Sequence, residues 1–101
     1  MLFHNITYNI DLNAEADFLD WMRTTHIPNV MRTGFPKSFK MLKLLTEIDN
    51  GGVTYSVQYF FDSIEGFEVY ENDYLDDLNL SVDKRYRGKY VFFASLLQEI
   101  F

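Results

Sequence analysis

Hydrophobic and polar residues alternate along two stretches of this chain, and a period of two predicts β-strands. The clearer stretch runs from residue 53 to residue 61, where Tyr55, Val57 and Tyr59 alternate with small polar side chains. It follows an Asn50-Gly51-Gly52 sequence, which is typical of a hairpin turn and indicates another strand just before it. Leu2 to Ile10 alternates in the same way and predicts the first strand.

A helix is expected after the first strand, because hydrophobic residues recur there every three or four positions. Asn13 is the expected N-cap of this helix. The stripe expected to face the sheet consists of Phe18, Trp21, Met22 and Thr25. Pro28 should interrupt the helix and push Ile27 towards an extended conformation, after which a short helical turn ends at Gly34.

A second helix is expected after the hairpin. Asp62 is its expected N-cap, with Glu65 three residues later as in a capping box, and Gly88 ends it. Acidic residues occupy its outer face, and basic residues gather at its C-terminal end, as the helix dipole prefers. Its inward stripe is expected to contain Ile64, Phe67, Tyr70, Tyr74, Leu78 and Val82.

Two further strands complete the pattern. The second strand is expected from Phe35 to about Ile48, the hairpin turn at Asp49–Gly52, and the last strand from Lys89 to Ile100. The order is βαββαβ, an α+β arrangement of the ferredoxin-like type. It predicts one domain, residues 1–101, with a four-stranded antiparallel sheet and both helices on one face of that sheet.

The other face of the predicted sheet carries almost no charge in its two central strands. Its side chains are Asn5, Thr7, Asn9, Thr54, Ser56 and Gln58. A face that meets solvent is usually richer in charge. We therefore expect this face to pack on a copy of itself, giving a homodimer of the dimeric α/β-barrel type.

The aromatic content supports a second buried surface. Of the 101 residues, 18 % are aromatic and 48 % are hydrophobic, a heavy load for a core of this size. A subunit interface would bury the surplus. The alternative is that several tyrosines lie half-exposed with their hydroxyl groups in water.

Charge and composition exclude several classes of function. The net charge of −6 disfavours nucleic acids and anionic membrane surfaces as partners. There is no cysteine, so disulfides and thiolate metal sites are excluded, and neither a membrane-spanning run nor a signal peptide is recognisable. We expect a cytoplasmic protein without metal or cofactor, although a site formed by His4, His26 and Asp62 is conceivable.

Candidate chemistry centres on the end of the first predicted helix. Trp21, Tyr55 and Tyr59 could line a pocket for a flat organic molecule between helix and sheet, the alternative being plain core packing. His26 could act as an acid or base there, or could cap the helix C-terminus. Either role predicts a buried imidazole with a hydrogen-bond partner.

The chain also resembles an uncharacterised family of small bacterial proteins from Bacteroidetes. The resemblance rests on Trp21-Met22, His26-Ile27-Pro28, Thr33-Gly34, Gly52, Thr54–Tyr59 and Leu96-Leu97, and it extends from Asn5 to Ile100. That family is similar in fold to the dimeric α/β-barrel superfamily. The resemblance implies this fold, dimerisation and a cytoplasmic bacterial origin, but it implies no activity.

Three functions follow as expectations. The first is a homodimer that binds a small organic molecule through Trp21, His26, Tyr55 and Tyr59. The second is an enzyme like the cofactor-free monooxygenases or isomerases of the wider superfamily, with His26 as the catalytic residue. The third is a structural or regulatory dimer without a ligand. Since one fold hosts many functions, the fold alone does not decide among them.

Overall fold

The computed structural model describes residues 1–46 and 51–101. The strands are β1 (Leu2–Asp11), β2 (Ser38–Lys43), β3 (Gly52–Phe61) and β4 (Tyr90–Gln98). One helical segment comprises η1 (Leu12–Ala14), α1 (Glu15–Trp21), η2 (Met22–His26) and α2 (Ile27–Arg32). The other comprises α3 (Ile64–Tyr70), η3 (Glu71–Leu75) and α4 (Asp76–Tyr86).

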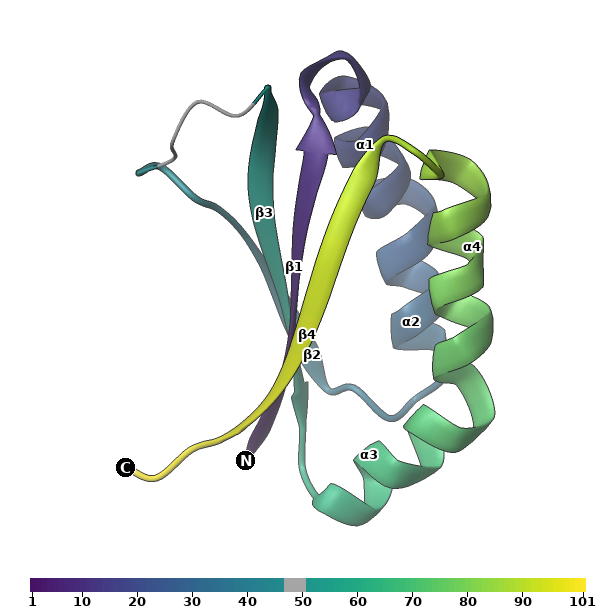
Figure 1. The fold of residues 1–101 in the computed structure, drawn as a ribbon. Helices are drawn as coiled ribbons and strands as arrows, with labels where there is room; N and C mark the ends of the chain where they lie inside the picture. Colours follow the sequence, from purple (N-terminus) through teal and green to yellow (C-terminus); the bar gives the residue numbers. More distant parts are fainter. Residues whose placement is uncertain (47–50) are drawn as a thin grey trace.

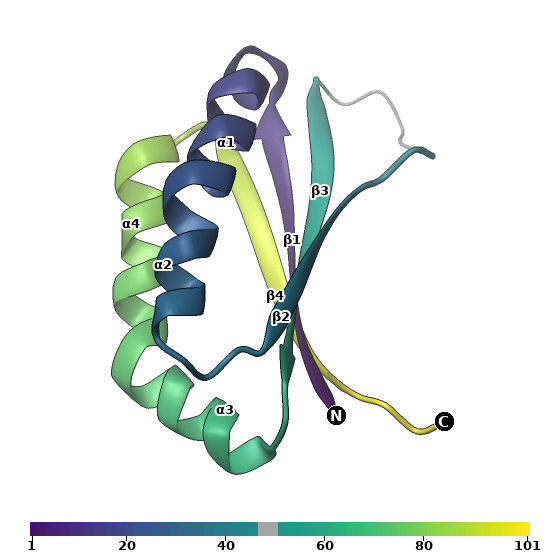
Figure 2. The ribbon, with the colours of Figure 1, turned by 180° about the vertical axis from the view of Figure 1, so that it is seen from behind.

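The strands form one antiparallel sheet in the order β2-β3-β1-β4. Both helical segments cover the same face of the sheet, and the other face is uncovered (Figures 1 and 2). The predicted ferredoxin-like βαββαβ fold is therefore confirmed. The dimer stays a prediction.

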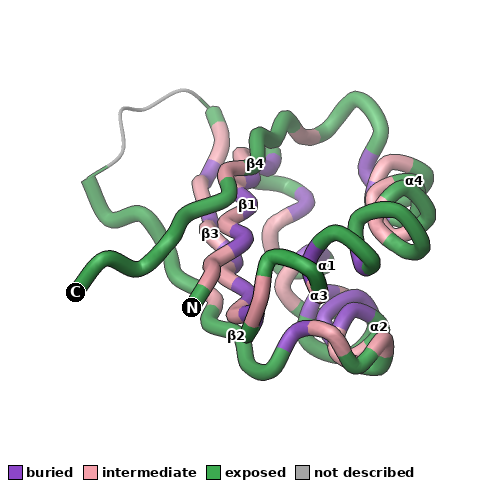
Figure 3. Tube along the Cα trace, turned by 90° about the horizontal axis from the view of Figure 1, so that it is seen from below, coloured by how far each residue is buried: buried purple, intermediate pink, exposed green. Residues whose placement is uncertain are grey.

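The register explains why alternate residues are buried. His4 pairs with Tyr59, Ile6 with Val57, and Tyr8 with Tyr55 across β1 and β3, and all six side chains face the helices. Because β1 and β3 are the two central strands, this face forms the floor of the core. Figure 3 shows that the buried residues are concentrated where the central strands meet the helices, while most residues of β2 and β4 are exposed.

Aromatic rings fill the space between the sheet and the helices. Phe18 on α1 lies with its ring centroid 5.4 Å from those of both Tyr8 and Tyr86, so it joins β1 to α4. Phe61 and Phe67 meet edge to face at 5.2 Å and join β3 to α3. Such ring pairs add to the free energy gained by burying their large apolar surface.

The first helical segment differs from its prediction at Pro28. Ile27 has φ −60° and ψ −44°, so the prediction of an extended residue there was wrong, and the helix continues to Arg32. A single wide π-turn at η2 ends at His26, two residues before Pro28, and the Ile27 N–H donates a hydrogen bond to the Met22 carbonyl. A helix with locally shifted hydrogen bonding can accommodate a residue that has no N–H to donate. Gly34, with φ 84°, ends the segment as predicted.

Both predicted helix N-caps were wrong, and some residues predicted to face the sheet do not. Asn13 lies within η1 and makes no side-chain cap, because a short 3-10 turn already continues into α1. Ser63, not Asp62, caps α3, and its Oγ accepts a hydrogen bond from the Gly66 N–H at 3.1 Å. Three residues predicted to face inward are instead exposed: Thr25, Ile64 and Tyr74.

The second strand is shorter than predicted, running only from Ser38 to Lys43, and Leu44 and Leu45 are exposed. Hydrophobic composition alone therefore overestimated its length. Residues 47 and 48 at the predicted end of this strand, and residues 49 and 50 of the predicted hairpin turn, lie outside the described residues. Gly52 already belongs to β3, and a side chain on it would meet the Asn9 side chain.

Candidate functional site

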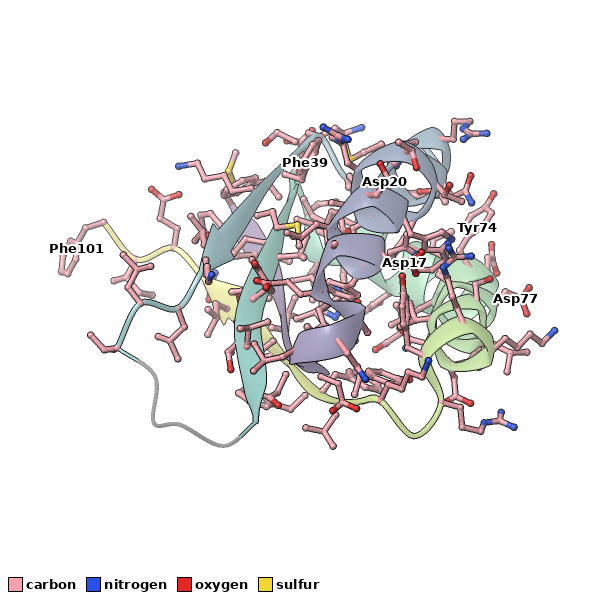
Figure 4. All side chains as sticks on the ribbon, turned by 90° about the horizontal axis from the view of Figure 1, so that it is seen from above. Asp17, Asp20, Phe39, Tyr74, Asp77 and Phe101 are labelled. Carbon is pink, nitrogen blue, oxygen red and sulfur yellow. The ribbon has the colours of Figure 1, made fainter. Side chains whose placement is uncertain are left out.

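A broad cleft opens between edge strand β2 and the first helical segment. It encloses about 910 Å³. Figure 4 labels Phe39 on its sheet side and Asp20 on its helix side. Its lining is mainly apolar and consists of Ala16, Leu19, Asp20, Arg23, Ile27, Pro28, Met31, Phe39, Met41, Leu42, Lys43 and Tyr55.

The cleft exists because the helix lies over the central strands, while β2 extends beyond the helix at the sheet edge. Met41 faces the helices beside Val57, yet it is only half-buried, and Phe39 remains exposed. Met31 contributes a second flexible thioether from α2. Methionine side chains adapt to ligands of irregular shape, so these walls suit an apolar guest.

One end of the cleft carries a hydrogen-bonded polar group. The Tyr55 hydroxyl donates to Glu15 Oε2 at 2.5 Å, and Lys43 Nζ lies 3.5 Å from the same oxygen. The Tyr55 hydrogen bond, followed by the nearby Lys43 charge, lowers the pKa of the Glu15 carboxyl despite some desolvation. Lys43 Nζ also lies 5.8 Å from the centroid of the Tyr55 ring. This end therefore has a positive charge beside an aromatic ring.

The helix-side rim carries an exposed ion pair. Arg23 Nη2 lies 3.2 Å from Asp20 Oδ1, one helical turn away. Both side chains are largely exposed, so the pair stabilises the fold little and either group can turn to a ligand. The cleft thus combines apolar walls with a few charged groups at its rim.

His26 lies outside this lining. It is only 3 % exposed, which agrees with the predicted buried imidazole, and its ring stacks on Trp21 with centroids 5.1 Å apart. A regular helix separates positions i and i+5 widely, but the π-turn at η2 has i→i+5 geometry and aligns the two rings. His26 is therefore inside a continuous helix and does not cap its end.

The chemistry of His26 follows from its burial. Desolvation lowers the pKa of its imidazole from 6.5 to about 4, so the ring is neutral at neutral pH. The predicted hydrogen-bond partner is not found for this ring among the described residues, and the ring instead stacks on Trp21. A general acid or base works best with a pKa near the working pH, and His26 does not meet that condition.

Trp21 lies between α1 and α4, away from the cleft. Its ring meets Tyr86 at 5.6 Å and the Arg85 guanidinium at 5.5 Å. Arg85 and the Tyr86 hydroxyl both donate to Asp17, joining the two helical segments. These hydrogen bonds lower the pKa of the Asp17 carboxyl, the one from Tyr86 contributing most. The surroundings of Trp21 are those of a helix–helix contact.

Tyr59 lies in the core beside His4, its partner across β1 and β3. Its side chain is fully buried, and its hydroxyl has no hydrogen-bond partner among the described residues. Burial first, then the neighbouring Tyr8 and Tyr70, raises the pKa of the Tyr59 hydroxyl well above its ordinary value. The structure thus pairs Tyr59 with His4, and of the four predicted ligand-binding residues Tyr55 alone lines the cleft.

Sequence reasoning missed most of the cleft. The sequence analysis did not predict a role in a ligand site for four of its residues, because no local sequence pattern relates them: Met31, Met41, Asp20 and Arg23. The signal that could have found them is an edge strand rich in large hydrophobic residues opposite a helix with the small Ala16 on its flank.

Within residues 1–46 and 51–101, no group of three or more His, Cys, Asp or Glu side chains is placed to hold a metal ion. No helix in this part of the chain is both long and apolar enough to cross a membrane.

Solved structures of similar shape cover almost the whole chain. An ethyl tert-butyl ether D (EthD) family protein from Bacillus halodurans has a TM-score of 0.73 at 12 % identity, covering 99 % of this chain and 100 % of its own. A dimeric ferredoxin-like protein from an uncultured marine organism has a TM-score of 0.68 at 15 % identity, covering 99 % and 96 %. An antibiotic biosynthesis monooxygenase has a TM-score of 0.62 at 11 % identity, covering 99 % of each chain.

At such low identities these neighbours establish the fold and leave the chemistry open. A comparison with curated protein sequences gives no significant match. The family comparison is more specific, because one family model matches residues 1–100. By that match the chain belongs to the family described as a domain of unknown function, DUF4286.

Proposed function

We propose that this protein is a homodimer that binds a small organic molecule in the cleft between β2 and the first helical segment. The observation that carries the proposal is the cleft itself, with its apolar walls and charged rim. Ligand sites in proteins commonly combine these features and enclose about 300–1,000 Å³. The volume of about 910 Å³ falls within that range.

The groups at the rim favour a flat molecule with one polar end. Phe39, Met41 and Met31 offer apolar contact on both sides of the cleft. Lys43 stands beside the Tyr55 ring at one end, and Arg23 stands on the helix side. An aromatic acid would match this arrangement, since its ring would lie against the thioethers while its carboxylate meets a cation.

The open sheet face supports the homodimer. Its neutral centre is bordered by exposed apolar side chains, above all Phe93, Val91 and Leu97 on β4 and Leu42 on β2. Exposed apolar patches of this kind commonly mark interfaces between proteins. A similar solved structure is described as a dimeric ferredoxin-like protein, which agrees with this proposal. A stable interface would bury at least about 1,000 Å² in total.

The same observations favour binding over acid–base catalysis by His26. The imidazole stacks on Trp21 outside the cleft lining, and its pKa of about 4 leaves it neutral. The monooxygenase-like alternative rests on the fold of its neighbours alone. The cytoplasmic location and bacterial origin expected from the sequence stay predictions.

The four methionines offer a direct test of the cleft. Met31 and Met41 line it, whereas Met22 is fully buried in the core and Met1 lies at the N-terminus. In a protein labelled at the methionine methyl groups with ¹³C, 2-naphthoate should shift the NMR signals of Met31 and Met41 in a saturable manner. The Met22 and Met1 signals serve as internal controls and should stay in place. Equal shifts of all four signals, or none at all, would contradict the proposal.

A charge at the centre of the open face tests the dimer. Ser56 faces that side between Thr7 and Leu42, neither of which could compensate a new positive charge, so Ser56→Lys should convert the dimer to a monomer of 12.0 kDa in sedimentation equilibrium. Ser81→Lys is the matched control, because Ser81 is exposed on α4. It should leave the dimer intact. The dimer is refuted if the unmodified protein sediments as a monomer at micromolar concentration.

A further inference from the structure

A second pocket lies at the opposite edge of the sheet, between β4 and the start of the second helical segment. It encloses about 350 Å³ and is separate from the cleft at β2. Its apolar walls come from α3 and β4, and its charged residues are Glu68 and Glu71. The full lining consists of His4, Ile64, Phe67, Glu68, Glu71, Ala94, Ser95 and Leu96.

His4 lines this pocket and has a buried ring nitrogen without a hydrogen-bond partner among the described residues. It is 4 % exposed, and its Nδ1 atom has no hydrogen-bond partner among the described residues. Its ring is held edge-on by Phe67 at 5.1 Å and by Tyr70 at 6.5 Å, so it cannot easily swing to water. A buried polar atom without a partner is costly, and one that lines a pocket can be satisfied by a ligand.

The charge around the pocket has one sign. No lysine or arginine lines it, and the sequence contains neither residue from Leu44 to Asp83. Glu68 and Glu71 are both exposed and form no ion pair with another described residue. Two exposed carboxylates in the lining attract a cation and repel an anion.

We propose that this pocket binds an amphipathic amine, with its ammonium group at Glu68 and Glu71 and a hydrogen-bond donor at its other end pointing towards His4 Nδ1. The apolar middle of the ligand would lie between Phe67 on α3 and Leu96 on β4. Burial keeps the pKa of the His4 imidazole at about 4, so the ring is neutral and its Nδ1 can accept a hydrogen bond. The two clefts of the molecule would thus prefer ligands of opposite charge.

Three probes separate these contributions. Tyramine has an ammonium group, an aromatic spacer and a phenolic donor, and it should bind in isothermal titration calorimetry. Phenethylamine lacks the phenol, and the unpaired Nδ1 should then weaken its binding by about tenfold relative to tyramine. 4-Hydroxyphenylacetate replaces the ammonium by a carboxylate and should not bind. Equal affinity for all three probes, or no binding of tyramine, would overturn the proposal.

The exposed carboxylates allow a variant that keeps its fold. Glu68→Gln with Glu71→Gln should weaken tyramine binding by at least about tenfold. The matched control, Glu65→Gln with Asp73→Asn, changes exposed acids of the same segment that do not line the pocket, and it should retain full affinity. The ¹⁵N shift of His4 Nδ1 should move on tyramine binding in the unmodified protein. Equal loss in both variants, or an unmoved Nδ1 signal with bound tyramine, would refute the site.

Discussion

The two faces of the sheet are built from the same strands but differ in how far their side chains are buried. On the face beneath the helices, every described side chain of β1 and β3 from His4 to Ile10 and from Val53 to Phe61 is buried. On the other face, residues one position away stay half-exposed, and large apolar side chains of β4 lie open. The fold of one chain needs only the first face. The proposed dimer would account for the apolar composition of the second face.

Removing one ring from each face should separate these roles most strongly. Phe18 is fully buried and touches rings from β1, β3 and α4, so Phe18→Ala should lower the free energy of unfolding by about 3–5 kcal/mol. Phe93 is 63 % exposed on the open face, and Phe93→Ala should cost less than about 1 kcal/mol in dilute, monomeric protein. Urea unfolding measures both. A similar decrease in the free energy of unfolding in both variants would contradict the distinction between the faces.

Between pH 6.5 and 4, acid should weaken the covered side of the sheet, because both histidine side chains are buried there. Burial lowers the pKa of each imidazole from 6.5 to about 4, so the unfolded chain binds protons more readily than the folded one. The stability due to neutral histidines is complete above pH 6.5 and falls as the pH drops towards 4, by about 3 kcal/mol for each histidine. Urea unfolding at a series of pH values measures this loss.

The two imidazoles can be followed separately in the same pH range. Neither His4 nor His26 should titrate near 6.5 in NMR spectra of the folded protein, because protonation must await a much lower pH or unfolding. An ordinary titration of either ring at 6.5 would contradict its burial. It would also deprive His4 of its role as a neutral acceptor in the second pocket.

A smaller effect is expected at the margin of the covered face. Ser63→Ala removes the side chain that accepts from the Gly66 N–H, and it should lower the free energy of unfolding by about 1 kcal/mol. Asp62→Ala is the control, because Asp62 is exposed and does not cap α3. Asp62→Ala should lower the free energy of unfolding by less than Ser63→Ala does. The reverse order would restore Asp62 as the cap predicted from the sequence.

Local sequence patterns predicted the fold well because each element depends on near neighbours along the chain. Alternation at Leu2–Ile10 and Val53–Phe61 identified the central strands, and glycines 34 and 88 marked the helix ends. The same reasoning failed where two neighbouring residues compete for one role. Asp62 and Ser63 both suit an N-cap, and only the geometry of the entering chain selected Ser63.

The candidate sites were much less accessible to sequence reasoning. Trp21, His26, Tyr55 and Tyr59 all carry suitable chemistry, but the structure directs them into different surroundings. The π-turn at η2 stacks His26 on Trp21, which a regular helical period would keep apart. Sequence reasoning did not predict that Arg23 and Met41 line the cleft. They lie on a helix and a strand, and the distance between these two elements is set by packing.

The sequence by itself determined the order of elements, the two central strands and the uncharged centre of the open face, because periodicity and turn chemistry act over a few residues. Tertiary structure alone decided which edges of the sheet the helices leave uncovered, and hence where both pockets lie. It also left His4 Nδ1 without a hydrogen-bond partner among the described residues, in the pocket that Glu68 and Glu71 line. Those outcomes depend on how helix surfaces fit the twisted sheet, which joins residues far apart in the chain.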